Sequence, residues 1–327
     1  MSYVPTSNEA LATELDLEQY RRELTGYCYR MLGSGFDAED AVQETMVRAW
    51  KSLDRLESPE ALRSWLYRIA SNVCFDMLEG SKKRARPMDL ASPSMADTTI
   101  DSGLPEEMWI QPMPDAKILP ADGDPAEVAE AKETIRLAFV AALQNLPPKQ
   151  RAVLILREVL RWQASEVAEL LDTTVVSVNS ALQRARATLD EADIDASGPT
   201  AVDGEEERDL LTKYVDAFER YDIEALVSLL HDDATFTMPP YELWLQGPSE
   251  IYKWFFGQGI GCKGSRVLVT EANGKPAYGS YRPAGDSVWK PWGIVILEAS
   301  NGKIAHVNQF IYPELFPLFG FPTELRG

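Results

Sequence analysis

The chain has 327 residues, of which 45% are hydrophobic, and its formal net charge is −19. This length predicts two or three domains, and this hydrophobic content is enough for folded cores, which excludes a chain that is disordered throughout. No apolar run approaches the roughly 20 residues that a membrane-spanning helix needs.

The N-terminus and the cysteines both favour a cytoplasmic protein. Residues 1–16 have neither the basic start nor the apolar stretch of a signal peptide. Cys28, Cys74 and Cys262 lie far apart and lack CxxC spacing. They are therefore expected to be buried thiols in a reducing compartment, and we expect no disulfide set, no metal site and no cofactor.

The negative charge is unevenly distributed along the chain. Residues 16–86 carry 12 basic and 12 acidic side chains, and residues 135–189 carry 7 basic against 4 acidic ones. The net charge is −9 over residues 87–134 and −11 over residues 190–327. The first two segments are thus free to meet nucleic-acid phosphates, and the acidic ones could compete with DNA for them.

Residues 1–86 predict a helical domain. An amphipathic helix covers about 17–31 and ends at Gly33, Asp37 caps a second helix, and Pro59 opens a third. The positions expected to face inward on the second helix are Val42, Met46, Ala49, Trp50 and Leu53.

Residues 87–125 are rich in Pro, Asp, Ser and Met without any period, which predicts an extended, acidic, Pro-rich linker. Residues 126–195 predict a second helical domain. It contains a helix that runs to Asn145, a helix that starts at Pro147-Pro148, and a pair split near Asp172-Thr173 with helix-turn-helix proportions.

A break at 195–199 precedes a last domain at 203–327. Two helices are expected there, followed by segments of alternating polarity that read as strands. Asn273-Gly274 and Asn301-Gly302 have the sequence of hairpin turns. The predicted fold class is therefore multidomain, with two all-α domains followed by an α+β domain.

Two motifs lie in the first helical block, DAEDAVQETMVRAW at 37–50 and SWLYRIASN at 64–72. This block resembles region 2 of the extracytoplasmic-function (ECF) sigma factors. On a helix, Asp40, Gln43 and Glu44 share one face and Arg48 lies one turn beyond. The resemblance implies that this face binds the β′ clamp of core RNA polymerase; the alternative is an ordinary solvated face.

The segment from Asp54 to Leu62 and the helix after it match the part of the family that opens the −10 promoter element. A captured, unstacked base needs hydrogen-bonding groups and stacking neighbours. Asn72 matches a polar position that contacts the −10 strand in relatives, and a core position is favoured for Trp65. Basic side chains that would bind backbone phosphates, without reading sequence, are Arg68, Lys82, Lys83, Arg84 and Arg86.

Residues 146–189 resemble sigma region 4, which implies contacts with the β flap of polymerase and with the −35 element. A recognition helix reads bases near its N-terminus and phosphates further on. The expected buried stripe is Val175, Val178, Leu182, Ala185 and Leu189. The residues expected to face outward are Ser177, Asn179, Ser180, Gln183, Arg184 and Arg186. Of these, Ser177, Asn179 and Ser180 are the candidates for base readout. Arg184 and Arg186 are the candidates for phosphate contacts that position the helix.

Region 4 also departs from the family pattern, because Asn179 and Ala181 stand where Lys and Arg are commoner. Contact with the −35 element is therefore expected to be weaker or tuned to other bases.

The last domain resembles the SnoaL-like (nuclear transport factor 2-like) domains fused to some ECF sigma factors, on Tyr214–Phe218, Leu229–Pro240 and Trp244–Pro248. That fold is a curved sheet wrapped by helices around an apolar cone. His231 is expected at a helix end, and His306 either lines the cone or packs in the core. An aromatic interior that a small apolar ligand fits is predicted, and no catalytic residue is assigned. The aromatic residues expected there are Tyr241, Trp244, Trp254, Phe255, Trp289 and Trp292.

The interpretation favoured by these motifs is a sigma factor that directs promoter recognition and is autoregulated by its C-terminal domain. Promoter DNA and core RNA polymerase are the expected partners, and no membrane is involved. The alternative is a DNA-targeted enzyme of the cyclase or isomerase type that uses the SnoaL-like pocket. A simple helix-turn-helix repressor would leave the Asp40-Gln43-Glu44 motif unexplained.

Overall fold

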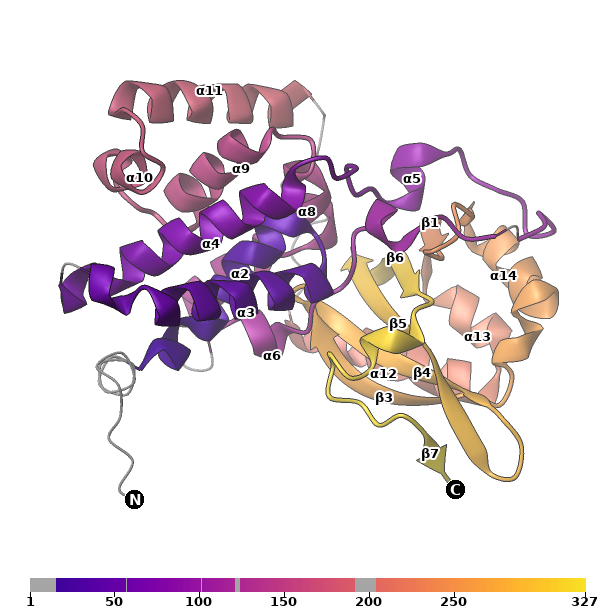
Figure 1. Cartoon of the computed structure of the whole chain (residues 1–327). Coiled ribbons are helices and arrows are strands. Elements are labelled where there is room, and N and C mark those ends of the chain that lie inside the picture. The colour runs from indigo at the N-terminus through magenta and orange to yellow at the C-terminus, as the bar shows by residue number, and fades with distance from the viewer. Residues whose placement is uncertain (1–15, 57, 101, 121–123, 192–203) are drawn as a thin grey trace, which may run out of the picture. The chain divides into compact units, whose positions relative to one another are not determined.

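The computed structural model describes residues 16–56, 58–100, 102–120, 124–191 and 204–327 (Figure 1). They form two compact units, each described here by itself. The helical unit takes its residues from 1–83, 116–135 and 139–194, and the sheet unit takes its residues from 84–115, 136–138 and 195–327. The predicted break at 195–199 lies outside the described residues. The predicted fold class, helical domains followed by an α+β domain, is confirmed.

The N-terminal part of the helical unit consists of three long helices, as the sequence predicts. They are α2 (Arg21–Leu32), α3 (Gly35–Lys51) and α4 (Leu62–Leu78), with short 3-10 turns at Leu17–Tyr20, Leu53–Arg55 and Pro59–Ala61. α2 ends at Gly33 in the left-handed conformation with φ 71°. The predicted cap of α3 is wrong: Ser34 caps it by accepting a hydrogen bond from the Asp37 N–H at 3.1 Å. Asp37 instead lies in the first turn, where a carboxylate favours the helix dipole.

The remaining helices of this unit follow the predicted order with one exception. They are α7 (Pro125–Glu133), α8 (Leu137–Leu143), α9 (Pro148–Leu154), α10 (Ala164–Leu170) and α11 (Val175–Glu191), with α6 (Asp115–Ile118) before them and a π-helical turn at Ile155–Val159. α8 begins in residues 136–138, which belong to the sheet unit. The helix expected to run to Asn145 is two helices, α7 and α8, separated at 134–136.

Two buried arginines join the segments of the helical unit. Arg151 of α9 donates to the carbonyl oxygen of Met31 on α2 and, at 2.6 Å, to Oε1 of Gln144. Arg30 of α2 donates to the carbonyl oxygen of Thr134 at 3.1 Å and to that of Gly26 at 2.7 Å. Burial lowers the pKa of each guanidinium to about 10, so both stay charged at neutral pH. Because each carries a buried charge, both depend on these acceptors.

The sheet unit has a mixed sheet with strand order β2-β1-β6-β5-β4-β3, and β7 pairs with β5 (Figure 1). The strands are β1 (Leu230–Thr237), β2 (Trp244–Gln246), β3 (Arg266–Ala272), β4 (Lys275–Pro283), β5 (Val288–Ser300), β6 (Lys303–Phe310) and β7 (Leu325–Arg326). β1 runs parallel to β6 and the other pairs are antiparallel. Three helices pack on one face: α12 (Gly204–Arg220), α13 (Ile223–Ser228) and α14 (Pro248–Phe256).

Both predicted hairpin turns are confirmed. Asn273 and Gly274 have φ values of 53° and 74° between β3 and β4, and Asn301 and Gly302 have 51° and 73° between β5 and β6. Positive φ at both central residues is what a two-residue hairpin turn requires, and Asn-Gly adopts it at little cost.

Residues 84–115, here called the strap, have a defined place in the sheet unit, which differs from the extended linker that the sequence predicts. The Ser94 N–H donates to the carbonyl oxygen of Trp244 at 2.8 Å, and the Trp244 indole donates to that of Ala91 at 2.9 Å. Further along, the Met113 N–H donates to Oδ1 of Asn273 at 2.9 Å. The strap holds α5 (Pro87–Leu90) and a 3-10 turn at Glu106–Met108.

Burial explains why the strap packs although it has no period. Trp109 is fully buried, and Ile110 and Met113 are buried with it. Ala96 belongs to the main apolar cluster of the sheet unit and Ile100 packs against that cluster. Ordering the strap costs backbone entropy, and the burial of these apolar side chains offsets that cost.

The C-terminal tail, residues 311–327, packs against the sheet within the same unit. Phe316 is fully buried, with its ring centroid 4.9 Å from that of Tyr281 on β4. The Tyr281 hydroxyl donates to the carbonyl oxygen of Pro322 at 2.9 Å. Within the described part of the chain, no helix has the length and apolar character to cross a membrane.

Candidate functional site

The predicted polar face of α3 is present and open to solvent. Asp40, Gln43, Glu44 and Arg48 are all exposed. Arg48 pairs with Glu44 one turn back at 2.7 Å and with Asp76 of α4 at 3.1 Å. These ion pairs are exposed, so they contribute little to stability, but they fix the orientation of the Arg48 side chain.

A shallow apolar groove of about 440 Å³ lies beside this face. Its lining residues are Leu17, Glu18, Arg21, Gln43, Met46, Val47, Trp50 and Lys51. Trp50 was expected to face inward, but it is 44% exposed, and Val47 is 38% exposed. An exposed tryptophan beside polar side chains is typical of a surface that binds another protein.

The residues predicted to bind the −10 region fall into two groups. Asn72, Arg68, Lys82 and Lys83 belong to the helical unit and are exposed. Lys83 donates to Oδ1 of Asn145, and Arg68 donates to the carbonyl oxygen of Glu169 at 3.0 Å.

Arg84 and Arg86 belong to the strap instead. Arg84 is buried and donates to the carbonyl oxygens of Glu106 and Trp109 at 3.0 and 2.8 Å. Arg86 pairs with Asp89 at 3.0 Å. In this conformation Arg84 has a structural role in the sheet unit, so its predicted contact with DNA requires the start of the strap to be released.

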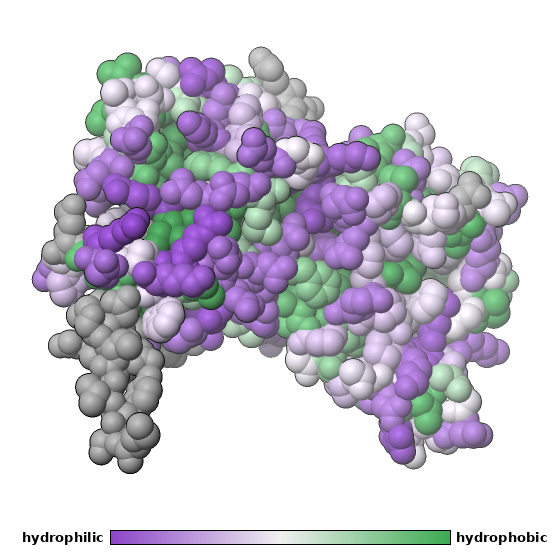
Figure 2. All heavy atoms as spheres, in the orientation of Figure 1, coloured by the Kyte–Doolittle hydropathy of each residue, from purple (hydrophilic) through white to green (hydrophobic). Residues whose placement is uncertain are grey.

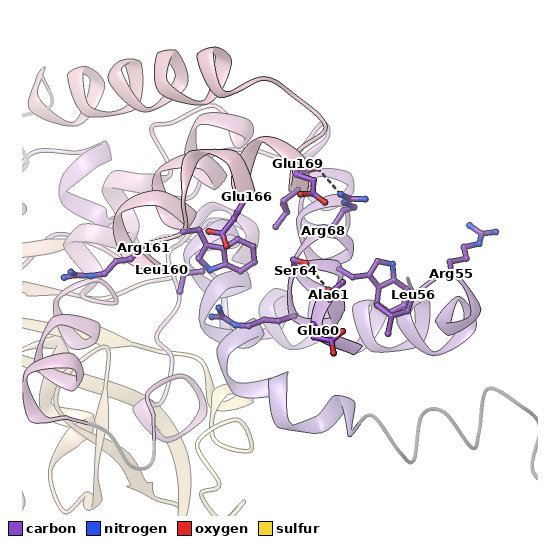
Figure 3. A pocket seen from close by; sticks show the side chains of 14 residues that line it. Arg55, Leu56, Glu60, Ala61, Ser64, Arg68, Leu160, Arg161, Glu166 and Glu169 are labelled. Atoms are coloured by element: carbon purple, nitrogen blue, oxygen red, sulfur yellow. Dashed lines mark hydrogen bonds between the residues drawn. The ribbon is translucent and has the colours of Figure 1, made fainter. Parts of the chain in front are cut away.

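A pocket of about 730 Å³ lies in the helical unit against α4 (Figure 3). One wall is the segment predicted to open the −10 element, with Arg55, Leu56, Glu60 and Ala61. The other wall comes from the turn before α10 and from α10 itself, with Leu160, Arg161, Trp162, Glu166, Glu169 and Leu170. Arg63, Ser64, Trp65 and Arg68 of α4 complete the lining, so Trp65, favoured for the core, is half-buried beside the pocket. Figure 2 shows that the visible face of the helical unit is largely hydrophilic.

The recognition helix is α11. Its predicted outward residues Ser177, Asn179, Gln183, Arg184 and Arg186 are exposed, and Ser180 is half-buried. The buried stripe is Val178, Ala181, Leu182 and Ala185. The prediction that Val175 is buried is wrong.

Val175 is the first residue of α11 and is 42% exposed. Two of the outward side chains are engaged. Oγ of Ser177 accepts a hydrogen bond from the Thr174 hydroxyl at 3.0 Å, and Arg186 pairs with Glu158 at 2.6 Å.

The interior of the sheet unit is packed with aromatic rings. Phe255 lies at centroid distances of 5.8 to 6.3 Å from Phe236, Tyr221 and Phe218. Tyr278 lies 5.9 Å from Phe218 and 6.3 Å from Tyr214. These rings, with Trp254, supply the aromatic interior, whereas Trp244, Trp289 and Trp292, which were also expected there, lie outside the cluster.

The two histidines have separate surroundings. His306 is opposite Thr235 and Glu298 in the sheet, next to Val307, whose side chain belongs to the helix-covered core. Successive strand residues alternate between faces, so His306 points away from the cone. Its Nδ1 lies 2.8 Å from Oγ1 of Thr235. Nδ1 of His231, on β1, accepts a hydrogen bond from the Asp233 N–H at 3.3 Å.

Comparison with known proteins is consistent with this geometry along the whole chain. Residues 17–84 match the Sigma-70 region 2 family, residues 136–189 match Sigma-70 region 4, and residues 211–307 match the SnoaL-like domain. The ECF RNA polymerase sigma factor SigG of Mycobacterium tuberculosis is 44% identical over 311 residues, which cover 94% of this chain and 83% of SigG. This chain belongs to the ECF RNA polymerase sigma factor family. It therefore binds core RNA polymerase and promoter DNA, and it directs promoter recognition and transcription initiation.

Two further similarities concern the same architecture. The ECF sigma factor SigJ of M. tuberculosis is 26% identical over 326 residues, 95% of each chain. The crystal structure of SigJ matches with a TM-score of 0.58 at 23% identity, over 94% of this chain and 99% of that one. These matches show a similar fold, with the domains in the same order along the chain.

Sequence reasoning missed two residues that organise these surfaces. Trp162 closes the pocket on α4, and Trp109 anchors the strap. Each is an isolated tryptophan at a turn or in an unpatterned segment, so periodicity carried no signal for either. The only available signal was their size, since a large aromatic side chain is rarely left in solvent.

Proposed function

We propose that this sigma factor binds the β′ clamp of core polymerase through the α3 face and the groove beside it. The polar face offers Asp40, Gln43 and Glu44, and the groove offers Val47 and Trp50 as apolar contacts. A helical partner that buries Trp50 and pairs with the exposed carboxylates fits both surfaces. Region 4 is proposed to contact the β flap and the −35 element.

For the −10 element, the proposed contacts are Asn72 for the captured strand and Arg68, Lys82 and Lys83 for phosphates. These residues are exposed on or just after α4. Arg84 and Arg86 join them once the start of the strap leaves the sheet unit.

For the −35 element, we expect Asn179→Ala to change base preference and Arg184→Ala or Arg186→Ala to weaken binding to all sequences alike. A base contact is worth about 1–3 kcal/mol of discrimination, whereas a phosphate contact changes the salt slope by about one. The effect of Arg186→Ala should be smaller, because Arg186 is paired with Glu158. Binding of the holoenzyme to a panel of −35 variants at several salt concentrations measures both quantities. Uniform losses for all three variants would mean that α11 does not read bases.

We also propose that the sheet unit regulates the sigma factor by holding the chain that connects regions 2 and 4. The observation that carries this proposal is that the strap and residues 136–138 are built into the sheet unit. The sheet unit therefore grips the connection at two places, after region 2 and at the start of region 4. Regions 2 and 4 must separate along this connection to reach two promoter elements, so the grip opposes promoter binding.

At the start of region 4, the sheet unit holds the connection through a buried ion pair. Arg136 lies 3.4 Å from Oε2 of Glu298, and their side chains are only 6% and 8% exposed. Burial alone would raise the pKa of Glu298, but His306, Arg136 and Lys275 outweigh it and hold that pKa below its usual value. Glu298 also accepts a hydrogen bond from Asn308 at 2.9 Å. Losing one partner of such a pair leaves a buried charge without compensation.

Arg136→Ala in the full-length protein is therefore expected to raise the affinity of the free sigma factor for DNA, by about fivefold or more. Lys290→Ala is the control, since Lys290 of β5 pairs with Glu324 at 2.8 Å in the same unit and is not among the charges that act on Glu298. Fluorescence anisotropy with duplex DNA measures the affinity, and thermal unfolding checks both variants. Equal affinities for the two variants would contradict the proposal.

A point variant is a better test than a truncation. Removing residues 204–327 would expose Trp109, Ile110 and Met113 of the strap, which are buried in the intact unit. The truncated chain would then be prone to aggregate, and its DNA affinity would not report on the grip alone.

A further inference from the structure

Trp162 of region 4 lies against region 2 within the helical unit. It occupies the turn between the π-helical turn at 155–159 and α10, where its backbone N–H donates to the carbonyl oxygen of Leu156 at 2.9 Å. Its side chain is only 7% exposed, and its ring centroid is 5.0 Å from that of Tyr67 on α4. The indole is therefore buried in part by a residue of region 2.

Arg63 completes this contact. Its guanidinium carbon lies 5.3 Å from the ring centroid of Trp162 and 5.4 Å from that of Tyr67. Glu23 of α2 pairs with Arg63 at 2.8 Å. A guanidinium over two aromatic faces adds electrostatic attraction to the area that the rings bury. We call Trp162, Tyr67 and Arg63 the aromatic latch.

The latch closes the surface that is proposed to capture the −10 strand. Arg55, Leu56, Glu60 and Ala61, from the segment predicted to open the −10 element, line the same pocket as Trp162 (Figure 3). On the same side, Arg68 donates to the carbonyl oxygen of Glu169 on α10 at 3.0 Å, as the dashed line in Figure 3 marks. The turn that carries Trp162 forms the opposite wall of this pocket, so a DNA strand bound along residues 55–61 would meet it.

The closed latch leaves two buried polar groups without a hydrogen-bond partner among the described residues, the Tyr67 hydroxyl and the Trp162 indole N–H. A buried donor without a partner lowers the stability of the state that buries it, and water restores the lost hydrogen bond when the contact opens. The buried area of the rings therefore stabilises the closed latch, whereas its unsatisfied hydrogen-bonding groups destabilise it. This balance suits a contact that must open.

We propose that the aromatic latch holds region 4 over the strand-capturing surface of region 2, so that single-stranded promoter DNA binds only after Trp162 withdraws. This inference rests on the proposed −10 role of that surface. It is separate from the grip of the sheet unit, because all three latch residues belong to the helical unit.

The first test compares two substitutions of one residue in the full-length protein. Trp162→Ala removes the ring and should raise the affinity for single-stranded DNA about tenfold. Trp162→Phe keeps an aromatic ring and removes the unsatisfied N–H, so its affinity should equal that of the wild type or fall below it. The probe is a fluorescein-labelled single-stranded oligonucleotide of randomised sequence. Unchanged affinity for a folded Trp162→Ala variant would overturn the proposal.

The second test does not depend on how Trp162 variants fold. Ser64→Cys and Glu166→Cys place thiols on opposite walls of the pocket, where both native side chains are exposed. The native cysteines are buried, so a flexible bis-maleimide should react at the two new sites alone. The cross-linked chain should lose affinity for the oligonucleotide, and the same chain capped with a mono-maleimide should keep it. Equal binding by the cross-linked and capped chains would refute the latch.

Run-off transcription with the wild-type holoenzyme distinguishes failure of the latch from failure of the proposed function. If only the latch is wrong, the holoenzyme still initiates transcription and the cross-linked chain still binds the oligonucleotide. If the −10 role of this surface is wrong, Arg68→Ala and Asn72→Ala holoenzymes open promoters as well as the wild type does.

Discussion

Replacing Asp40 and Gln43 together with alanine is expected to abolish detectable binding to core RNA polymerase and to leave the fold intact. Both side chains are exposed on α3, and truncation at exposed positions typically changes stability by no more than about 0.5 kcal/mol. In a polymerase complex the same side chains would become buried, and the groups that they leave unpaired on the partner would each cost about 1–3 kcal/mol. Titration of labelled core polymerase measures the binding, and thermal unfolding measures the stability.

The matched control removes two exposed polar side chains from a helix that the proposal does not assign to polymerase. Thr212 and Asp216 of α12 are exposed, so the Thr212→Ala, Asp216→Ala variant removes one negative charge and one neutral polar side chain, as the α3 double variant does. Its affinity for core polymerase should match that of the wild type. Equal affinities for the two double variants would show that the α3 face does not bind the clamp.

Arg151→Ala is expected to destabilise the helical unit by about 3–5 kcal/mol. Besides Met31 and Oε1 of Gln144, the guanidinium donates to the carbonyl oxygens of Gln144 at 3.3 Å and Leu146 at 3.1 Å. The variant would leave these buried acceptors unpaired and would open a cavity between α9 and α2. Denaturant unfolding followed by far-UV circular dichroism gives the free energy of unfolding.

Lys149→Ala serves as the control for this prediction, because Lys149 lies on the same helix and is exposed. It should change the free energy of unfolding by no more than about 0.5 kcal/mol. A loss for Arg151→Ala as small as that for Lys149→Ala would mean that the guanidinium does not join α9 to α2.

The parts of the fold that could be predicted from the sequence depend on local chemistry. Asn273-Gly274 and Asn301-Gly302 predicted hairpin turns because few other residue pairs adopt two successive positive φ angles cheaply. Gly33 predicted the end of α2 for the same reason. The cap of α3 was misplaced because Ser34 and Asp37 are both good capping residues, and only the chain direction between α2 and α3 decides between them.

The parts that could not be predicted depend on contacts between segments far apart in the sequence. The strap has no period because its apolar side chains meet the sheet unit singly, through Ala96, Trp109 and Met113, and not along one face of a helix or strand. Trp50 was expected inward from helical spacing, yet no segment among the described residues covers that edge of α3, so it is exposed. His306 and Val307 are neighbours on β6, so their side chains lie on opposite faces of the sheet. Knowing that Val307 lies in the core therefore assigns His306 to the other face, but this requires the strand register.

The candidate surfaces divide in the same way. The α3 face and the outward side of α11 follow from helical periodicity, and the structure has these residues exposed apart from Ser180, which is half-buried. The closure of region 2 by Trp162 depends on how two helical segments about 100 residues apart pack together, which no local pattern records.

The measurement that tests the central claim most directly is run-off transcription from a library of bacterial promoter fragments. Core RNA polymerase is supplied alone, with the wild-type chain, or with the Asp40→Ala, Gln43→Ala variant. We expect discrete transcripts with defined start sites only when the wild-type chain is present. The same transcript pattern from core polymerase alone, or from the double variant, would contradict the account.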